Sequence, residues 1–273
     1  MIEVVNLSDT GRKRPHNEDS AITVPSLGLA IVADGMGGYK AGEVASAIAV
    51  KAIFDIVKQG LDDLSATAAS AKAAGVTTHS LLLYNAVQFA NGHIFRTARD
   101  VPQCQGMGTT VVAALFLNNT LTVAHVGDSR LYRFRDKELK QLTSDHSLVQ
   151  ELIDRGFFTP EEAAANTPKN LVTRALGIDE VVEPDVKEYQ TETNDVYLIC
   201  SDGLNDMVND EEIRLTLSKY YANLPEAGRE LIQMANANGG KDNISVVLIR
   251  PRTDAQTGGS WVSRLKSSFR RTG

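Results

Sequence analysis

The sequence predicts an α+β fold in which antiparallel strands and helices share one large domain. Apolar runs typical of strands and periodic segments typical of helices are mixed, without the strict alternation of a doubly wound parallel sheet. Two strand-like runs, 109–117 and 121–134, are joined by Asn118-Asn119, which favours a tight hairpin turn. With 273 residues, the chain is long enough to bury a sizeable core.

The first half of the chain contains two predicted helices. The first covers 44–57, where apolar residues recur every four positions at Val44, Ile48, Ala52 and Ile56, with Ala45, Ala49, Ile53 and Val57 beside them. The second covers 80–98 and places apolar and aromatic residues on one side, namely Leu82, Ala86, Phe89, Ala90 and His93. The stretch between them is rich in small residues and is interpreted as a connection.

The second half adds a hairpin, two central strands and two helices. The runs 131–134 and 139–142 flank a polar turn and predict the hairpin. The continuously apolar runs 196–200 and 244–249 are typical of central strands, and helices fit 210–220 and 225–237.

A segment at 146–178 interrupts the strands and has a helix-like pattern broken by Pro160 and Pro168, so we interpret it as an inserted flap.

We expect a domain over 1–250 and a basic, flexible tail over 251–273. In the tail, Trp261, Leu265 and Phe269 lie four residues apart beside basic residues. This pattern could form a short helix for a membrane surface or a partner, but disorder is favoured.

Charge and cysteine content narrow the function classes. The net charge is −6, and because the tail from Pro251 on carries +4, the rest carries −10. An acidic body argues against nucleic acid as the main partner. Two cysteines, Cys104 and Cys200, are too few for a disulfide framework and favour a reducing, cytoplasmic location. The N-terminus lacks a signal-peptide pattern, and no run is long enough for a transmembrane helix.

Carboxylates recur at the ends of predicted strands. Asp34 and Asp202 each follow an apolar run, Asp242 precedes one, and Asp128 interrupts the run 121–134. A further acidic pair, Glu18-Asp19, lies near the N-terminus. Any one of them alone is most simply a turn residue. Together in one partly dry cleft they would repel one another unless a cation neutralised them.

The chemistry of these side chains indicates which cation. Ligand sets made only of oxygen atoms favour Mg²⁺, Mn²⁺ or Ca²⁺ over zinc. Gly35 follows Asp34, and a glycine there would let a bare backbone carbonyl approach the ion. The glycine-rich loop 35–38 is not a Walker loop, because the required Lys and Ser/Thr spacing is absent.

Seven motifs occur in an order that resembles the metal-dependent Ser/Thr protein phosphatase family (PPM, type 2C), in its bacterial branch. They are RKRPHNED (12–19), VADGMGG (32–38), GTT (108–110), HVGDSRLYR (125–133), TSDHS (143–147), CSDGL (200–204) and GGKDNISVVLI (239–249). The resemblance covers about residues 1–250. It implies a central sandwich of two antiparallel β-sheets flanked by helices on both faces, in α-β-β-α layers, with the flap as an insertion.

The resemblance also implies roles for the carboxylates. Asp34 would bridge two Mn²⁺ or Mg²⁺ ions, and the Gly35 carbonyl, Asp202 and Asp242 would complete the protein ligands. Asp128 resembles the ligand of a weaker third ion. Glu18 and Asp19 would act through metal-bound water.

Two ions about 4 Å apart can share one water and lower its pKa towards neutrality. The bridging hydroxide would attack phosphorus in line with the serine or threonine oxygen. Arg14 would hold the phosphate as a bidentate fork, although it could also be one residue of a basic run. Met36 stands where many eukaryotic members carry a histidine that protonates the leaving group, so no general acid is assigned.

The leading hypothesis is a phosphatase of phosphoserine and phosphothreonine proteins, with a Ser/Thr kinase and its substrates as partners in signalling. One alternative is a catalytically inactive phosphoprotein-binding pseudophosphatase. The presence of Asp34, Asp202 and Asp242 argues against it. Another is a metal-dependent phosphodiesterase or nuclease, which the acidic body and the lack of a basic, aromatic groove disfavour.

Overall fold

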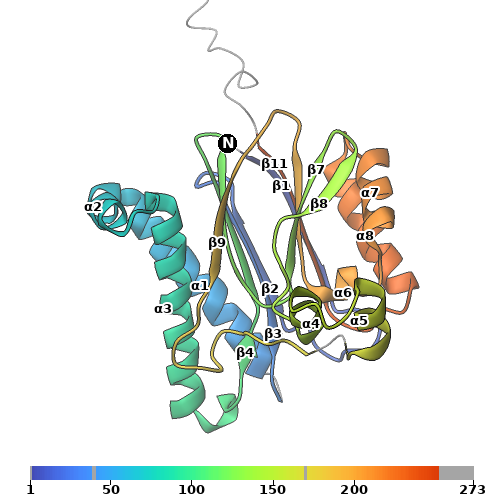
Figure 1. Cartoon of the computed structure of the whole chain (residues 1–273), viewed down its shortest axis with the longest axis horizontal. Coiled ribbons are helices and arrows are strands. Elements are labelled where there is room, and N and C mark those ends of the chain that lie inside the picture. Colours follow the sequence, from blue (N-terminus) through green and yellow to red (C-terminus); the bar gives the residue numbers. More distant parts are fainter. Residues whose placement is uncertain (1, 39–40, 169–170, 252–273) are drawn as a thin grey trace, which may run out of the picture.

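Two antiparallel β-sheets stack at the centre of the protein, with helices on both outer sides (Figure 1). The computed structural model describes residues 2–38, 41–168 and 171–251. In the first sheet the strand order is β1-β11-β10-β7-β8, formed by Ile2–Asp9, Ile244–Pro251, Val196–Cys200, Arg130–Arg135 and Glu138–Gln141. In the second it is β2-β3-β5-β6-β9, formed by Asp19–Val24, Leu29–Met36, Val111–Leu117, Thr120–Val126 and Asp185–Gln190, with β4 (Gly108–Thr109) paired to β3.

Helices cover the outer face of each sheet. On the second sheet lie α1 (Ala41–Asp62) and α3 (Thr78–Asp100), connected by α2 (Leu64–Ala74). On the first sheet lie α7 (Asp210–Lys219) and α8 (Leu224–Ala237). The remaining helices of the described residues are short: the 3₁₀ turn Pro102–Cys104, α4 (Leu148–Asp154), α5 (Pro160–Asn166) and α6 (Asp202–Asn205). The α-β-β-α sandwich implied by the resemblance is confirmed.

Three apolar cores hold these layers together because each sheet is apolar on both faces. One core lies between the second sheet and α1 and α3, and another between the first sheet and α7 and α8. The third lies between the sheets, where Phe116 meets Tyr197 edge-on with ring centroids 5.1 Å apart. Strands buried on both faces explain why the sequence runs at 111–116 and 196–200 are continuously apolar and why 244–249 is apolar apart from the buried Ser245.

The helices form where predicted, and most residues of each predicted apolar face are buried. In α1 the fully buried apolar residues are Ala45, Ala49, Ile53 and Val57, whereas Val44 is exposed. In α3 the residues Leu82, Ala86 and Ala90 face the core, but Phe89 is 47% exposed and packs on His93.

Both predicted hairpin turns are confirmed, and backbone geometry explains them. Asn118 and Asn119 adopt φ of 49° and 60°, and Asp136 and Lys137 adopt 51° and 66°. Two successive left-handed residues match the twist of the strands they join. Asparagine and aspartate tolerate this conformation better than most residues.

Other parts of the chain depart from the sequence-based interpretation. The connection between the first two helices is itself largely helical, because α2 spans Leu64–Ala74 and ends at Gly75 in the left-handed conformation. Strands β1, β2 and β9 were not predicted. The exposed faces of β1 and β9 carry polar residues, which obscures their strand pattern.

The segment predicted as a flap contains α4 and α5, so its broken helical pattern is confirmed. A bridge between Ser147 and Val172 brings its two ends together. The predicted amphipathic tail pattern at Trp261, Leu265 and Phe269 falls outside the described residues. Within the described part of the chain, every helix is too short or too polar to cross a bilayer.

Candidate metal centre

Strand pairing brings the first carboxylates together at one end of the sandwich. Asp19 at the start of β2 is the direct partner of Asp34 in β3. Asp202 begins α6 directly after β10, and Asp242 lies just before the neighbouring strand β11. Ser201 donates a hydrogen bond of 2.8 Å from its hydroxyl to Oδ2 of Asp19 and thereby connects the two sheets.

The centre depends on one asparagine that the sequence analysis did not single out. The side chain of Asn243 accepts a hydrogen bond from the Glu18 amide (2.8 Å) and donates to the carbonyls of Thr10 and His16 (both 2.9 Å). It therefore fixes the N-terminal loop beside Asp242. Its position directly after Asp242 in the motif GGKDN was the available signal.

Glycine at position 35 is required by packing. A Cβ atom built there would lie 2.1 Å from the carbonyl oxygen of Gly42 in α1 and 2.6 Å from that of Glu18. The start of α1 thus packs directly on the backbone of β3 beside Asp34.

Crowding raises the pKa values of the carboxylates. Burial is the main cause at Asp34, and the nearby charges of Asp19, Asp202, Asp128 and Asp242 raise its pKa further, well above the ordinary range. Burial, with Asp128 and Asp242 next in importance, raises the pKa of Asp202 to about 8. The same cause raises the pKa of Asp19 to about 6.

Two buried oxygens in this cluster have no hydrogen-bond partner among the described residues: Oδ1 of Asp19 and Oδ1 of Asp202. An unpartnered buried carboxylate oxygen costs stability unless something binds it. Several converging carboxylates with free oxygen atoms fit a hard divalent cation such as Mn²⁺ or Mg²⁺.

Asp128 lies in the loop between β6 and β7 and is 8% exposed. Burial, followed by the charge of Asp145, raises its pKa to about 6. Asp145 itself forms a bidentate ion pair with Arg130, with contacts of 2.7–3.0 Å. A cavity of about 680 Å³ opens here between the centre and the flap, and its lining includes Asp128, Asp202, Asp206 and Pro160.

Arg14 reaches the centre from the N-terminal loop. Its Nη2 donates a hydrogen bond of 2.6 Å to Oδ2 of Asp242, and half of the side chain is exposed. Met36, by contrast, pairs with Gly108 in the β3–β4 ladder and offers no titratable group. The structure therefore brings together Asp19, Asp34, Asp202, Asp242 and Arg14, with Glu18 beside them and Asp128 at the edge of the adjoining cavity.

The fold thus places a cluster of buried carboxylates, whose chemistry fits a divalent cation, at one end of a two-sheet sandwich. The sequence model of the protein phosphatase 2C family matches residues 13–248. The chain belongs to this family.

Relatives and solved structures agree with this assignment. The serine/threonine phosphatase stp of Listeria welshimeri is 40% identical over 245 residues, which is 89% of this chain and 93% of that protein. The crystal structure of the phosphatase PstP of Mycobacterium tuberculosis matches with a TM-score of 0.80 and 38% identity, covering 92% of this chain and 99% of that one. A PstP catalytic-domain structure with two manganese ions matches with a TM-score of 0.76 and 38% identity, covering 91% and 97%.

Proposed function

We propose that this chain is a protein serine/threonine phosphatase that hydrolyses phosphoserine and phosphothreonine with two Mn²⁺ or Mg²⁺ ions. The observation that carries the proposal is the convergence of Asp19, Asp34, Asp202 and Asp242, with two buried oxygens left unpartnered. Relatives named as serine/threonine phosphatases, at 39–40% identity over most of the chain, support the reaction class. We assign the activity to a domain spanning 1–250.

Asp34, the Gly35 carbonyl, Asp202 and Asp242 would hold the two ions. Glu18 and Asp19 would act through bound water, and Asp128 would hold a weaker third ion. When bound, the ions would supply an activated water and neutralise charge on the phosphate. The carboxylates would in turn be neutralised, which removes the repulsion that now raises the pKa of Asp34.

Arg14 would bind the phosphate oxygens of the substrate. A guanidinium carries five N–H donors, so the bond to Asp242 leaves others for a phosphate. Its half-exposed side chain lies at the surface of the centre, where a phosphorylated side chain would arrive. No side chain of this chain is proposed as the proton donor to the leaving oxygen, because Met36 cannot donate.

The substrates would be Ser/Thr-phosphorylated proteins, and we propose a Ser/Thr kinase as the enzyme whose phosphorylation this chain reverses. Both cysteines, Cys104 and Cys200, are free and buried. Two unpaired thiols suit a reducing compartment, so we propose a cytoplasmic location.

The test is phosphate release from a phosphothreonine peptide with Mn²⁺, Mg²⁺ or a chelator, for the wild type, Asp34→Ala and Asp100→Asn. Asp100 is an exposed aspartate paired with Arg99, outside the centre. We expect metal-dependent turnover in the wild type and in Asp100→Asn, and its loss in Asp34→Ala.

Each remaining outcome points to one alternative. Absence of turnover with any metal in a folded wild-type protein would remove the enzyme proposal, and phosphopeptide binding without turnover would favour a pseudophosphatase. Cleavage of an oligonucleotide in preference to the phosphopeptide would favour a phosphodiesterase. Equal activity of Asp34→Ala and the wild type would exclude the proposed centre.

A further inference from the structure

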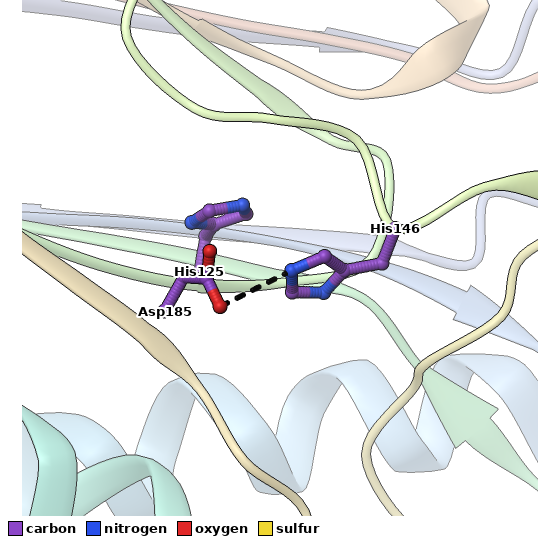
Figure 2. A group of neighbouring side chains, drawn as sticks. All are labelled: His125, His146 and Asp185. Carbon is purple, nitrogen blue, oxygen red and sulfur yellow. Dashed lines mark ion pairs between the residues drawn. The ribbon is translucent and has the colours of Figure 1, made fainter. Parts of the chain in front are cut away.

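A second cluster of metal-ligating side chains lies at the base of the flap (Figure 2). It consists of His125 at the end of β6, His146 at the start of the flap and Asp185 at the start of β9. One ligand atom from each lies within 4.8 Å of the other two. Figure 2 shows the imidazole of His146 directed at the Asp185 carboxylate, with Nε2 3.6 Å from Oδ1.

Neighbouring hydrogen bonds determine which nitrogens carry protons. Nε2 of His125 lies 2.8 Å from the carbonyl oxygen of Ser144, which can only accept, so Nε2 is protonated and the lone pair is on Nδ1. A histidine held through one nitrogen by a carbonyl is the usual arrangement of a metal ligand. Nδ1 of His146 accepts from the amide of Gly127 (3.2 Å).

The cluster has an unsatisfied group. His146 is 6% exposed, and its Nε2 has no hydrogen-bond partner among the described residues. Burial lowers the pKa of His125, and burial with the nearby charges of His125 and Arg174 lowers the pKa of His146 to about 4. Both rings are therefore neutral at pH 7, the protonation state in which imidazole binds metals.

We propose that His125, His146 and Asp185 form a binding site for a transition-metal ion of the Zn²⁺ type. Two imidazoles and one carboxylate are a ligand set that suits Zn²⁺ with a fourth, open position. The oxygen-rich centre formed around Asp34 selects Mn²⁺ or Mg²⁺ instead. The two sites thus differ in ligand chemistry as well as in position.

Occupation of this site changes the loop that carries Asp128. In the neutral His146 ring, Nδ1 accepts from Gly127 and Nε2 therefore carries the proton. When an ion binds Nε2, this proton moves to Nδ1, so that two donors, Nδ1 and the Gly127 amide, face each other. The hydrogen bond from Gly127 is lost, and Gly127 directly precedes Asp128. The ion would also connect His146, the first residue of the flap segment, with Asp185 in β9, which follows the segment.

Arg174 competes with the ion. Its Nη1 lies 3.3 Å from Oδ1 of Asp185, the same oxygen that faces His146. The Arg174 side chain is 46% exposed and can turn to solvent. Removing its charge should strengthen metal binding, because a cation beside a divalent ion repels it.

The experiment uses the full chain in saturating Mg²⁺, which occupies the oxygen-rich centre, and titrates Co²⁺ as a spectroscopic stand-in for Zn²⁺. Four-coordinate Co²⁺ with nitrogen ligands absorbs visible light far more strongly than six-coordinate Co²⁺. The variants are Asp185→Asn, His146→Gln and Arg174→Gln, with His93→Gln as the control because His93 lies exposed on α3. The NMR signal of the Gly127 amide is followed in a separate titration with Zn²⁺, because Zn²⁺ is diamagnetic and Co²⁺ would shift any nearby signal.

We expect one equivalent of strongly absorbing Co²⁺ in the wild type and in His93→Gln, displaced by Zn²⁺. Binding should weaken by at least about ten-fold in Asp185→Asn and His146→Gln, and tighten a few-fold in Arg174→Gln. In the Zn²⁺ titration, the Gly127 amide signal should shift in the wild type over the same single equivalent and stay unchanged in Asp185→Asn. Absence of the band in folded wild type, or an equal band in a folded Asp185→Asn protein, would overturn the proposal.

Discussion

Asp202 allows the electrostatic description of the centre to be tested without any measurement of activity. In the metal-free protein, burial and neighbouring aspartates raise its pKa from 3.8 to about 8. The folded state therefore retains the proton at pH values where the unfolded state has lost it. The contribution of the Asp202 carboxyl group to the free energy of unfolding is therefore fully present below pH 3.8 and is lost as the pH rises towards 8.

The size of this loss follows from the pKa values. Each pH unit within that window costs about 1.4 kcal/mol, so from pH 5 to pH 8 the wild type should lose up to about 4 kcal/mol through Asp202. Asp202→Asn keeps the shape of the side chain and removes the charge. In chelator, we expect Asp202→Asn to be more stable than the wild type at pH 8 by about 2 kcal/mol or more. This gain is smaller than about 4 kcal/mol because the buried amide has a desolvation cost of its own.

The assay is urea denaturation in chelator at pH 5 and pH 8, repeated with Mn²⁺. Manganese should stabilise the wild type much more than Asp202→Asn at pH 8. The control is Asp100→Asn, whose exposed carboxylate has a pKa lowered by Arg99 and should leave the pH dependence unchanged. The reasoning is refuted if Asp202→Asn and the wild type have the same pH dependence between pH 5 and pH 8.

Three further predictions concern single contacts. Gly35→Ala should lower the free energy of unfolding by more than about 3 kcal/mol in urea, since its Cβ would lie 2.1 Å from the Gly42 carbonyl oxygen; a stable variant would contradict this packing. Asn243→Ala should cost about 2–3 kcal/mol in the same assay, because three hydrogen bonds lose a partner; a cost near zero would mean that the loop does not depend on them. Arg14→Lys should raise KM for a phosphopeptide about ten-fold, since lysine lacks the fork; an unchanged KM would remove Arg14 from phosphate binding.

Local patterns in the sequence predicted much of the fold. Two left-handed residues in each hairpin turn are encoded by dipeptides such as Asn118-Asn119, and strands buried on both faces appear as unbroken apolar runs. The orientation of a helix is less local. In α1 the apolar face is buried unequally, because Ala45 and Ile53 are fully covered by the core whereas Val44 at the edge of that face is exposed.

The site was only partly predictable, because its supporting residues are joined by contacts between segments that lie far apart in the sequence. Asp34, Asp202 and Asp242 could be selected because each borders an apolar strand, and the motif resemblance suggested their common role. Their supporting residues could not be selected in that way. Asn243 bonds to residues more than 220 positions away, and the histidine cluster joins His125 and Asp185, which only the pairing of β6 with β9 places opposite each other.

The pairing of β1 with β11 has a consequence for synthesis. Eight residues at one end of the domain pair with eight at the other, from Ile2 opposite Pro251 to Asp9 opposite Ile244. Asp242 lies immediately before this final strand, and Arg14 can reach it only when the strand is in place. Contacts so distant in sequence form late, so a nascent chain on the ribosome cannot assemble the centre until residue 251 has emerged.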